Sequence, residues 1–246
     1  MKLLIDIGNT SAKLAIADGD CFVHFEHLAT SWTETFDRLL AAFPIDRCVI
    51  STVAGEDPAL IAALRKCDLP TLLLGIDAIP SPDGKIVHSK LSNCKLHGVP
   101  KSYGADRLAA DLGALALSPG RTLLVIDAGT CITYDLISRE GKLIGGVISP
   151  GVQLRLKAMH EHTARLPLFE AVPDTPLMGF DTRTCMTSSA THGTRFEIEG
   201  YIRHLLPQYP DLQVYLTGGN TFQLADDLQN CVTQAPHLLF HGLNQL

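Results

Sequence analysis

The feature that most constrains the fold of this chain is a sequence pattern near its start that occurs again almost half the chain later. Residues 3–16 form an apolar run that ends in Asp6, a bend of glycine and small polar residues, and a second apolar run. Residues 123–137 repeat this plan, with Asp127 at the end of the first run and Gly129 in the bend. Each copy predicts a β-hairpin whose first strand ends in a carboxylate.

The repetition also predicts the domain organisation. Both copies continue into a further strand, around residues 21–27 and 142–148, and internal similarity at half the chain length indicates a duplicated domain. A chain of 246 residues is long enough to give each copy its own core. We therefore expect an α/β protein with one domain at residues 1–118 and a second at 119–246. Two facing hairpins, each with a carboxylate and a glycine, would form a cleft that grips a metal–nucleotide from both sides.

The remaining sequence alternates helical and strand patterns, which favours a layered α/β arrangement. Ser31 is suited to cap the first helix and Pro58 to open the second. The Gly-Gly-Asn sequence at 218–220 is expected to turn a strand into a helix that continues to Leu228. The other expected helices are 31–43, 58–67, 109–117, 152–162 and 184–206, the strands are 47–53, 70–75, 85–88 and 213–217, and 165–182 is a loop.

The bend of the first hairpin carries groups suited to a phosphate. A glycine lets backbone N–H groups approach a phosphate closely, and the nearby hydroxyls and Lys13 add donors and charge. Asp6 then has oxygens with which to hold a divalent cation. Taken alone, the same residues would also suit an ordinary polar turn, and it is the second copy that favours the functional interpretation.

A second group of small and charged residues opens the helix expected at 109–117. An aspartate in a first turn complements the helix dipole, which accounts for Asp106 but not for Arg107 or Gly104. Glycines at 145–151 would let the backbone approach another group closely, although a tight turn before a helix is the plain alternative.

Composition narrows the function classes. The net charge is −6 without a Lys/Arg cluster, which argues against nucleic acid or an anionic membrane as a partner. The start is a strand rather than a signal peptide, and no apolar run reaches about 18 residues, so we expect a cytoplasmic protein. Seven cysteines stand singly, which predicts reduced thiols, several of them in the core. Neither cysteines nor histidines have metal-site spacing, so no structural metal is expected.

Four motifs together resemble the type III pantothenate kinases, within the acetate and sugar kinase, heat-shock chaperone and actin superfamily. They lie at residues 6–10, 104–107, 127–130 and 145–151, in an order and spacing that span most of the chain. The resemblance implies two duplicated ribonuclease H-like (actin-like ATPase) domains, each a mixed sheet flanked by helices, with a cleft between them. It also implies phosphorylation of pantothenate by ATP, the first committed step towards coenzyme A.

The resemblance further implies roles for individual residues. Asp127 falls on the position that binds a monovalent cation, K⁺ or NH₄⁺, and Asp6 lies near the Mg²⁺ of ATP. Asp106 would be the catalytic base. The family works as a homodimer formed through its second domain, in which Thr182 would reach pantothenate across the interface. The residues implied in ATP binding are Asp6, Ile7, Gly8, Asn9, Thr10, Ser11, Ala12, Lys13 and Thr130, and those implied in pantothenate binding are His97, Gly104, Ala105, Asp106, Arg107 and Thr182.

The chain departs from the family pattern at three positions. His97 stands where the family usually has a tyrosine that lines the pantothenate site. Asp181 replaces an asparagine, and Ser189 replaces a glycine seven residues after Thr182. The first departure concerns a substrate contact and the other two concern the placement of Thr182, while the aspartates are untouched.

The implied chemistry is physically reasonable for these residue types. Phosphoryl transfer needs in-line positioning and charge neutralisation, a base for the attacking hydroxyl, which Asp106 would supply, and a partner for the substrate carboxylate, which Arg107 would supply. Two alternatives stay open: a nucleotide-dependent regulatory or binding protein, and a kinase of another small hydroxylated substrate. The Gly104–Arg107 motif argues against the first, and His97 keeps the second open.

Overall fold

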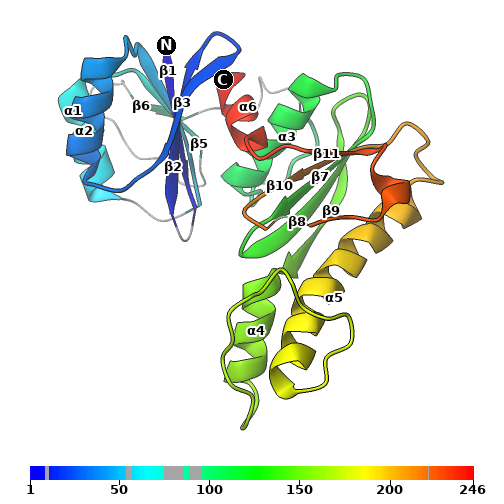
Figure 1. Ribbon diagram of the computed structural model, residues 1–246. Helices are drawn as coiled ribbons and strands as arrows, with labels where there is room; N and C mark the ends of the chain where they lie inside the picture. The colour runs from blue at the N-terminus through cyan, green and yellow to red at the C-terminus, as the bar shows by residue number, and fades with distance from the viewer. Residues whose placement is uncertain (9–10, 54–56, 75–85, 89–95, 221) are drawn as a thin grey trace. The chain divides into compact units, whose positions relative to one another are not determined.

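The computed structural model describes residues 1–8, 11–53, 57–74, 96–220 and 222–246, together with the backbone of 86–88. The chain divides into two compact units (Figure 1). Unit 1 consists of Met1–Leu117 together with His237–Leu246, and unit 2 consists of Ser118–Pro236. In the described part of the chain, no helix has both the length and the apolar character that crossing a membrane requires.

Unit 1 is built on a mixed sheet with the strand order β3-β2-β1-β4-β5-β6. Antiparallel β1–β2 and β2–β3 pairs form the expected hairpin and its third strand, and β1, β4, β5 and β6 run parallel. Its strands are β1 (Lys2–Ile7), β2 (Ala12–Asp18), β3 (Cys21–His27), β4 (Arg47–Thr52), β5 (Thr71–Leu74) and β6 (Ile86–His88), and its helices are α1 (Trp32–Ala42), α2 (Pro58–Cys67), α3 (Ala105–Leu117) and α6 (Leu238–Asn244).

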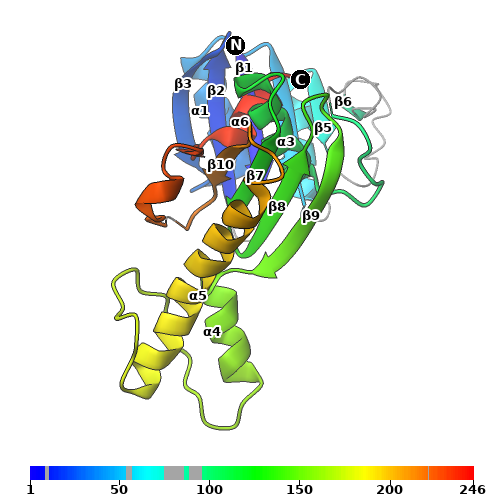
Figure 2. The ribbon, with the colours of Figure 1, turned by 90° about the vertical axis from the view of Figure 1, so that its right-hand side faces the viewer.

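Helices cover both faces of this sheet (Figures 1 and 2). Alternate side chains of a strand point to opposite faces, so Leu3 and Ile5 of β1 pack with α1 and α2 in one core. Leu4 and Asp6 lie on the other face, where α3 and α6 pack against β1 and β4. Both faces are therefore buried, which explains why β1 is almost continuously apolar from Leu3 to Ile7 apart from Asp6.

Local sequence signals set the ends of the first two helices. Ser31 caps α1, as expected, and the structure shows that it does so in a capping box with Glu34. Asp57 caps α2, where its Oδ1 accepts hydrogen bonds from the backbone N–H groups of Ala59 (2.9 Å) and Leu60 (3.1 Å). The other carboxylate oxygen of Asp57 accepts a hydrogen bond from the Trp32 indole (2.7 Å), which ties the two helices together.

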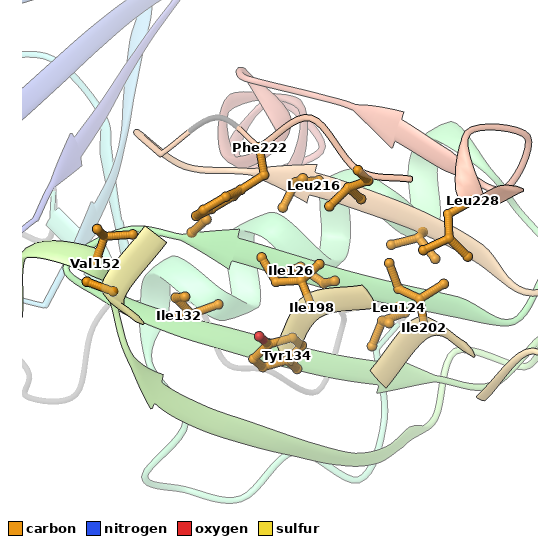
Figure 3. Packing of buried hydrophobic residues seen from close by; sticks show 14 of the residues in the cluster. Leu124, Ile126, Ile132, Tyr134, Val152, Ile198, Ile202, Leu216, Phe222 and Leu228 are labelled. Atoms are coloured by element: carbon orange, nitrogen blue, oxygen red, sulfur yellow. The ribbon is translucent and has the colours of Figure 1, made fainter. Parts of the chain in front are cut away.

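Unit 2 contains the second hairpin in a sheet with the order β11-β10-β7-β8-β9. The long helix α5 and the shorter α4 lie side by side and project away from the sheet (Figures 1 and 2). Leu124, Ile126 and Tyr134 of the sheet pack against Ile198 and Ile202 of α5 (Figure 3). The strands are β7 (Leu123–Ala128), β8 (Cys131–Ile137), β9 (Leu143–Pro150), β10 (Gln213–Thr217) and β11 (Val232–Gln234), and the helices are α4 (Val152–Glu161), α5 (Thr182–Leu205) and the 3₁₀ turn η2 (Asp226–Leu228).

Polar side chains of α5 fasten the preceding loop to the helix. The hydroxyl of Ser188 donates a hydrogen bond to the carbonyl of Leu177, and that of Thr191 donates to Val172 (3.2 Å). The ring Nε2 of His192 lies 2.9 Å from the carbonyl oxygen of Thr175. These three hydrogen-bonding contacts join the loop to α5.

Three expectations from the sequence are wrong. The segment that ends at Leu228 is not a helix: the described residues 222–225 have no regular secondary structure before η2. Phe222 and Leu224 both pack into the core of unit 2, and residues two apart do not share one face of a helix. The N–H of Ala225 in this segment donates a hydrogen bond to the carboxylate of Glu199 (2.9 Å) instead of entering a helix. The other two errors concern the C-terminal segment and the cysteines.

The last ten residues, assigned from the sequence to the second domain, belong to unit 1. Helix α6 crosses α3 at Gly113 and Gly242, where a Cβ on Gly242 would lie 1.7 Å from the carbonyl oxygen of Ala109. The cysteines differ from expectation in part: of the six that the structure describes only Cys48 is buried, while Cys67 and Cys231 are half-buried against the cores and the other three are exposed. That burial raises the pKa of the Cys48 thiol.

Candidate active site

The first candidate region is the end of the β1–β2 hairpin. Asp6 pairs across the hairpin with Lys13, so both side chains lie on the face that α3 and α6 cover. The N–H of Gly8 donates a hydrogen bond to the carbonyl of Ser11 (3.1 Å), which closes the turn. Of the other residues expected to hold the nucleotide, Ile7 and Ala12 pair with each other at the base of the turn. Asn9 and Thr10 lie outside the described residues.

Lys13 adds positive charge to this face of the sheet. The neighbour of Lys13 on β3 is His27. His237, just before α6, lies close enough for an electrostatic interaction with Lys13. Burial, and then the charge of Lys13, lowers the pKa of His237. The ring of His237 stacks on Phe25 of β3 with 3.9 Å between ring centroids, which joins the start of α6 to that strand.

The second candidate region is the start of α3, on the same side of the sheet. The carbonyl of Gly104 accepts the N–H of Leu108 (3.0 Å), so the helix begins four residues earlier than expected. The side-chain Oδ1 of Asp106 accepts a hydrogen bond from the N–H of Arg107 (2.7 Å), and both side chains are half-buried. Ala105, the residue before them, is buried. The first turn of α3 thus carries both a carboxylate and an arginine.

The second hairpin repeats the first with a shorter turn. Asp127 pairs with Thr133, in the place that Lys13 takes in the first hairpin. The N–H of Gly129 donates to the carbonyl of Cys131 (3.1 Å), the equivalent of the bond made by Gly8. Three residues, 129–131, separate the paired strands here, whereas four, 8–11, do so in the first hairpin. The duplicated turns have therefore diverged in length and in charge.

Backbone from two other segments packs closely around the second turn. Gly218 has φ +99°, and a Cβ on it would lie 2.6 Å from Oδ1 of Asp127. The N–H of Gly151 donates to the carbonyl of Thr130 (2.9 Å), and a Cβ there would lie 2.3 Å from the carbonyl oxygen of Gly129. These glycines are needed because each lies where a side chain would overlap the turn.

Asn220 is a residue of this cluster whose role the sequence analysis missed. Its Nδ2 donates hydrogen bonds to the carbonyls of Ala128 (2.8 Å) and Gly129 (3.0 Å), and its backbone N–H also donates to Ala128 (2.9 Å). An asparagine directly after a Gly-Gly pair at a strand end is the signal that points to such a contact. Asn220 therefore joins the segment after β10 to the Asp127 hairpin by hydrogen bonds.

Oxygen-bearing side chains flank Asp127 on the sheet. Thr217 of β10 and Thr133 of β8 are its two strand neighbours. Asp127 lies on the face opposite the core formed by Leu124 and Ile126. Carboxylate and hydroxyl oxygens are suitable ligands for a hard cation.

The remaining candidates lie elsewhere. Thr182 is the exposed first residue of α5, and His97 is exposed in a short bridge in unit 1. Asp181 caps α5 through Thr184, whose N–H lies 2.7 Å from the carboxylate, and hydrogen bonds from that residue lower the pKa of Asp181. Asparagine and aspartate are equivalent helix caps, so this departure preserves the helix start. Ser189 is also accommodated, because it is exposed and its hydroxyl donates to the carbonyl of Met186 (2.9 Å).

The two hairpin-led sheets define the class of protein. The chain has the fold of the superfamily of sugar kinases and actin-like ATPases, as solved structures confirm. A putative 2-dehydro-3-deoxygalactonokinase from Sinorhizobium meliloti matches with a TM-score of 0.57 at 15% identity, over 100% of this chain and 97% of the other. A protein from Campylobacter jejuni described as a putative Baf family transcriptional activator matches with a TM-score of 0.56 at 22% identity, over 99% and 96%. At these identities the likeness concerns the fold alone.

Sequence comparison identifies the family within that class. The family model for type III pantothenate kinase matches residues 2–204. Type III pantothenate kinases from Bacteroides fragilis and Phocaeicola vulgatus are each 36% identical over 246 residues, which cover 100% of this chain and 97% of the relatives. One from Porphyromonas gingivalis is 34% identical over 248 residues, with the same coverage. The chain belongs to the type III pantothenate kinase family.

Proposed function

We propose that this chain transfers the γ-phosphoryl group of ATP to the primary hydroxyl of pantothenate, which yields ADP and 4′-phosphopantothenate in the first step of coenzyme A biosynthesis. Family membership supports both the reaction and the substrate. The observation that supports the roles of individual residues is the position of Asp106 and Arg107. They open α3, which packs on the sheet face that also carries Asp6.

The β1–β2 hairpin is our proposed site for the phosphates of ATP. The half-buried Asp6 carboxylate beside a glycine turn fits a divalent cation bound with the nucleotide, and Lys13 fits an anionic phosphate. When bound, Mg²⁺ would neutralise charge on the transferred group. Thr130, exposed at the second turn, is a further proposed contact to ATP.

Asp106 is the proposed general base. Its carboxylate accepts the proton of the substrate hydroxyl as that oxygen bonds to the γ-phosphorus and the bond from the γ-phosphorus to the β–γ bridging oxygen breaks. Arg107 pairs with the carboxylate of pantothenate through its planar guanidinium. His97, Gly104 and Ala105 complete the proposed substrate site in unit 1.

Asp127 is the proposed ligand of a monovalent cation, K⁺ or NH₄⁺. Its surroundings fit that group, because Thr217 and Thr133, which carry hydroxyl oxygens, are its neighbours on the sheet. A bound cation would supply positive charge at the second hairpin. We keep the expectation that the protein acts in the cytoplasm without nucleic-acid or membrane partners.

We also propose a homodimer formed through the start of α5. Met178 is 83% exposed and Phe180 is 88% exposed. Gly179 between them packs so tightly on α5 that a Cβ would lie 2.3 Å from the backbone N of Cys185. The loop is therefore held to the helix while the side chains of Met178 and Phe180 are exposed close to Thr182 in sequence. A second copy of the chain would cover this surface and carry its own Thr182 to it.

The test of the catalytic proposal is Asp106→Asn. We expect turnover of pantothenate with ATP, Mg²⁺ and K⁺ to fall at least about 1,000-fold, since the attacking hydroxyl loses its base, while nucleotide binding measured by calorimetry changes little. Near-normal turnover would remove Asp106 from this role. Assay of the wild-type protein on a panel of hydroxylated acids and sugars separates the alternatives, because transfer to another substrate, or ATP binding without any transfer, would each contradict the proposed function.

The test of the dimer is Phe180→Lys, with Val23→Lys as the matched control. Val23 is an exposed apolar residue of β3 in unit 1, far in sequence from the proposed interface. We expect sedimentation to give a dimer for the wild type and for the control, and a monomer for Phe180→Lys. A monomeric wild type, or a variant that stays dimeric, would contradict the proposal.

A further inference from the structure

Three side chains four residues apart line one face at the start of α3. They are Tyr103, just before the helix, Arg107 in its first turn and Asp111 in its second. Residues with this spacing are neighbours on a helix surface. Tyr103 is 9% exposed and Asp111 is 0% exposed, whereas Arg107 is half-buried. The proposed substrate-binding arginine therefore lies between two buried residues whose roles the sequence analysis did not assign.

Tyr103 contacts both of the other residues. Its phenolic O–H donates a hydrogen bond of 2.6 Å to Oδ2 of Asp111, a short bond of the kind that a carboxylate acceptor forms. The guanidinium carbon of Arg107 lies 4.5 Å from the centroid of the Tyr103 ring, within the range of a cation–π interaction. The backbone N–H of Tyr103 also donates to the carbonyl of Pro100 (3.0 Å). The ring is thus held at its backbone end and at its hydroxyl end, with the guanidinium over its face.

We propose that Tyr103 is a positioning residue for Arg107, and that Asp111 holds Tyr103 in place. The inference rests on the proposed function, because it assumes that Arg107 binds the substrate carboxylate. An arginine side chain has many rotamers, and ordering them when the substrate binds costs free energy. A guanidinium already held against a fixed ring binds the carboxylate with less of that cost. The contact acts on binding of the acidic end of the substrate, so its loss should raise KM more than it lowers kcat.

The competing explanation is purely structural: the Tyr103–Asp111 pair would stabilise the start of α3 and nothing else. A structural defect would affect all substrates alike, whereas a defect in positioning Arg107 would affect only a substrate with a carboxylate. The neutral alcohol analogue, in which the carboxylate of pantothenate is replaced by a hydroxymethyl group, keeps the reacting hydroxyl. The ratio of kcat/KM for the acid to that for the alcohol therefore measures the role of Arg107.

The test compares this ratio among variants, with thermal unfolding as a check on folding. Tyr103→Leu removes the ring, and we expect it to raise KM for pantothenate about tenfold, with KM for ATP and kcat/KM for the alcohol unchanged. Tyr103→Phe keeps the ring but loses the bond to Asp111, so its effect should be smaller. If Tyr103→Leu folds poorly, Tyr103→Met repeats the test, because methionine also lacks the ring and its flexible side chain adapts to the space more easily. Leu115→Ala, a buried change further along α3, is the control that should leave the ratio unchanged.

The possible results separate this inference from the proposed function. Arg107→Gln should lower the acid-to-alcohol ratio more than any Tyr103 variant. If Arg107→Gln lowers it and the Tyr103 variants affect both substrates equally, or neither, the positioning role is wrong. If Arg107→Gln leaves the ratio unchanged, or the wild type does not phosphorylate pantothenate, the proposed function is wrong instead.

Discussion

Gly218 lies so close to Asp127 that a Cβ on the glycine would be 2.6 Å from the aspartate Oδ1 and 2.6 Å from the backbone N of Ala128. Its φ of +99° belongs to the region that only glycine adopts readily. The end of β10 can therefore meet the second hairpin only because this residue has no side chain. An added Cβ on Gly219, the next residue, would have no atom within 4 Å, so a substitution there serves as the comparison.

Gly218→Ala should damage both stability and cation use. The strained backbone and the overlap with Asp127 predict a loss of roughly 3 kcal/mol in the free energy of unfolding. The displaced carboxylate predicts that the K⁺ concentration for half-maximal activity rises at least about tenfold, if Asp127 holds the cation. Urea unfolding and a K⁺ titration of activity measure the two effects. Gly219→Ala should match the wild type in both, and an equal response of the two variants would contradict the role of the Gly218 contact.

Gly104→Ala should reduce activity with little loss of stability. A Cβ on Gly104 would lie 2.5 Å from Oδ1 of Asp106, and the tip of that side chain can rotate away at low cost. The carboxylate would then leave its present orientation, so we expect kcat to fall about 10- to 100-fold. The free energy of unfolding should change by less than about 1 kcal/mol. Steady-state kinetics and a thermal melt give both values. Unchanged kcat would show that this orientation of Asp106 is not needed for turnover.

Gly242→Ala should lower the free energy of unfolding, because α3 and α6 cross in unit 1 where Gly242 contacts Ala109. The added methyl group would lie 1.7 Å from a carbonyl oxygen, and separating the helices should cost about 3 kcal/mol or more. Gly200→Ala is the matched control within a helix: it has nothing within 4 Å, so it should stabilise α5 by about 0.5–1 kcal/mol. Denaturant unfolding measures the stability of both variants. If both substitutions changed the free energy of unfolding in the same direction, the close contact of α3 and α6 at Gly242 would be contradicted.

Asp211 should stabilise the folded state at neutral pH, and this contribution to the free energy of unfolding should be lost in acid. Hydrogen bonds from the backbone of Thr122 and then from Arg139 lower the pKa of Asp211 to about 2. Since this value lies below the ordinary value near 4, the contribution is complete above about pH 4 and is lost as the pH falls towards 2. Asp211→Asn should therefore be less stable than the wild type at pH 6, by a margin that shrinks at pH 3 and below. Asp174→Asn, in an exposed loop, is the control, and a margin independent of pH would contradict the prediction.

The sequence predicted those parts of the fold that depend on local pattern. Both hairpins, their third strands and helix α2 occur where expected, because apolar runs, turn residues and caps act over a few residues. The C-terminal helix α6 and the irregular segment before η2 could not be predicted in this way. Phe222 and Leu224 are apolar residues in either conformation, and only the core into which both pack favours the irregular segment over a helix.

For the candidate site, the sequence by itself determined which residue types are available: two Asp-x-Gly turns, the Gly104–Arg107 motif and the glycines at 145–151 and 218–219. The tertiary structure decided which of them meet. Gly151, Gly218 and Asn220 converge on the Asp127 turn through hydrogen bonds and contacts between residues about 20 to 90 positions apart, and such distances leave no local signal. In the same way, the ring of Tyr103 lies beneath Arg107 because the buried carboxylate of Asp111 holds its hydroxyl.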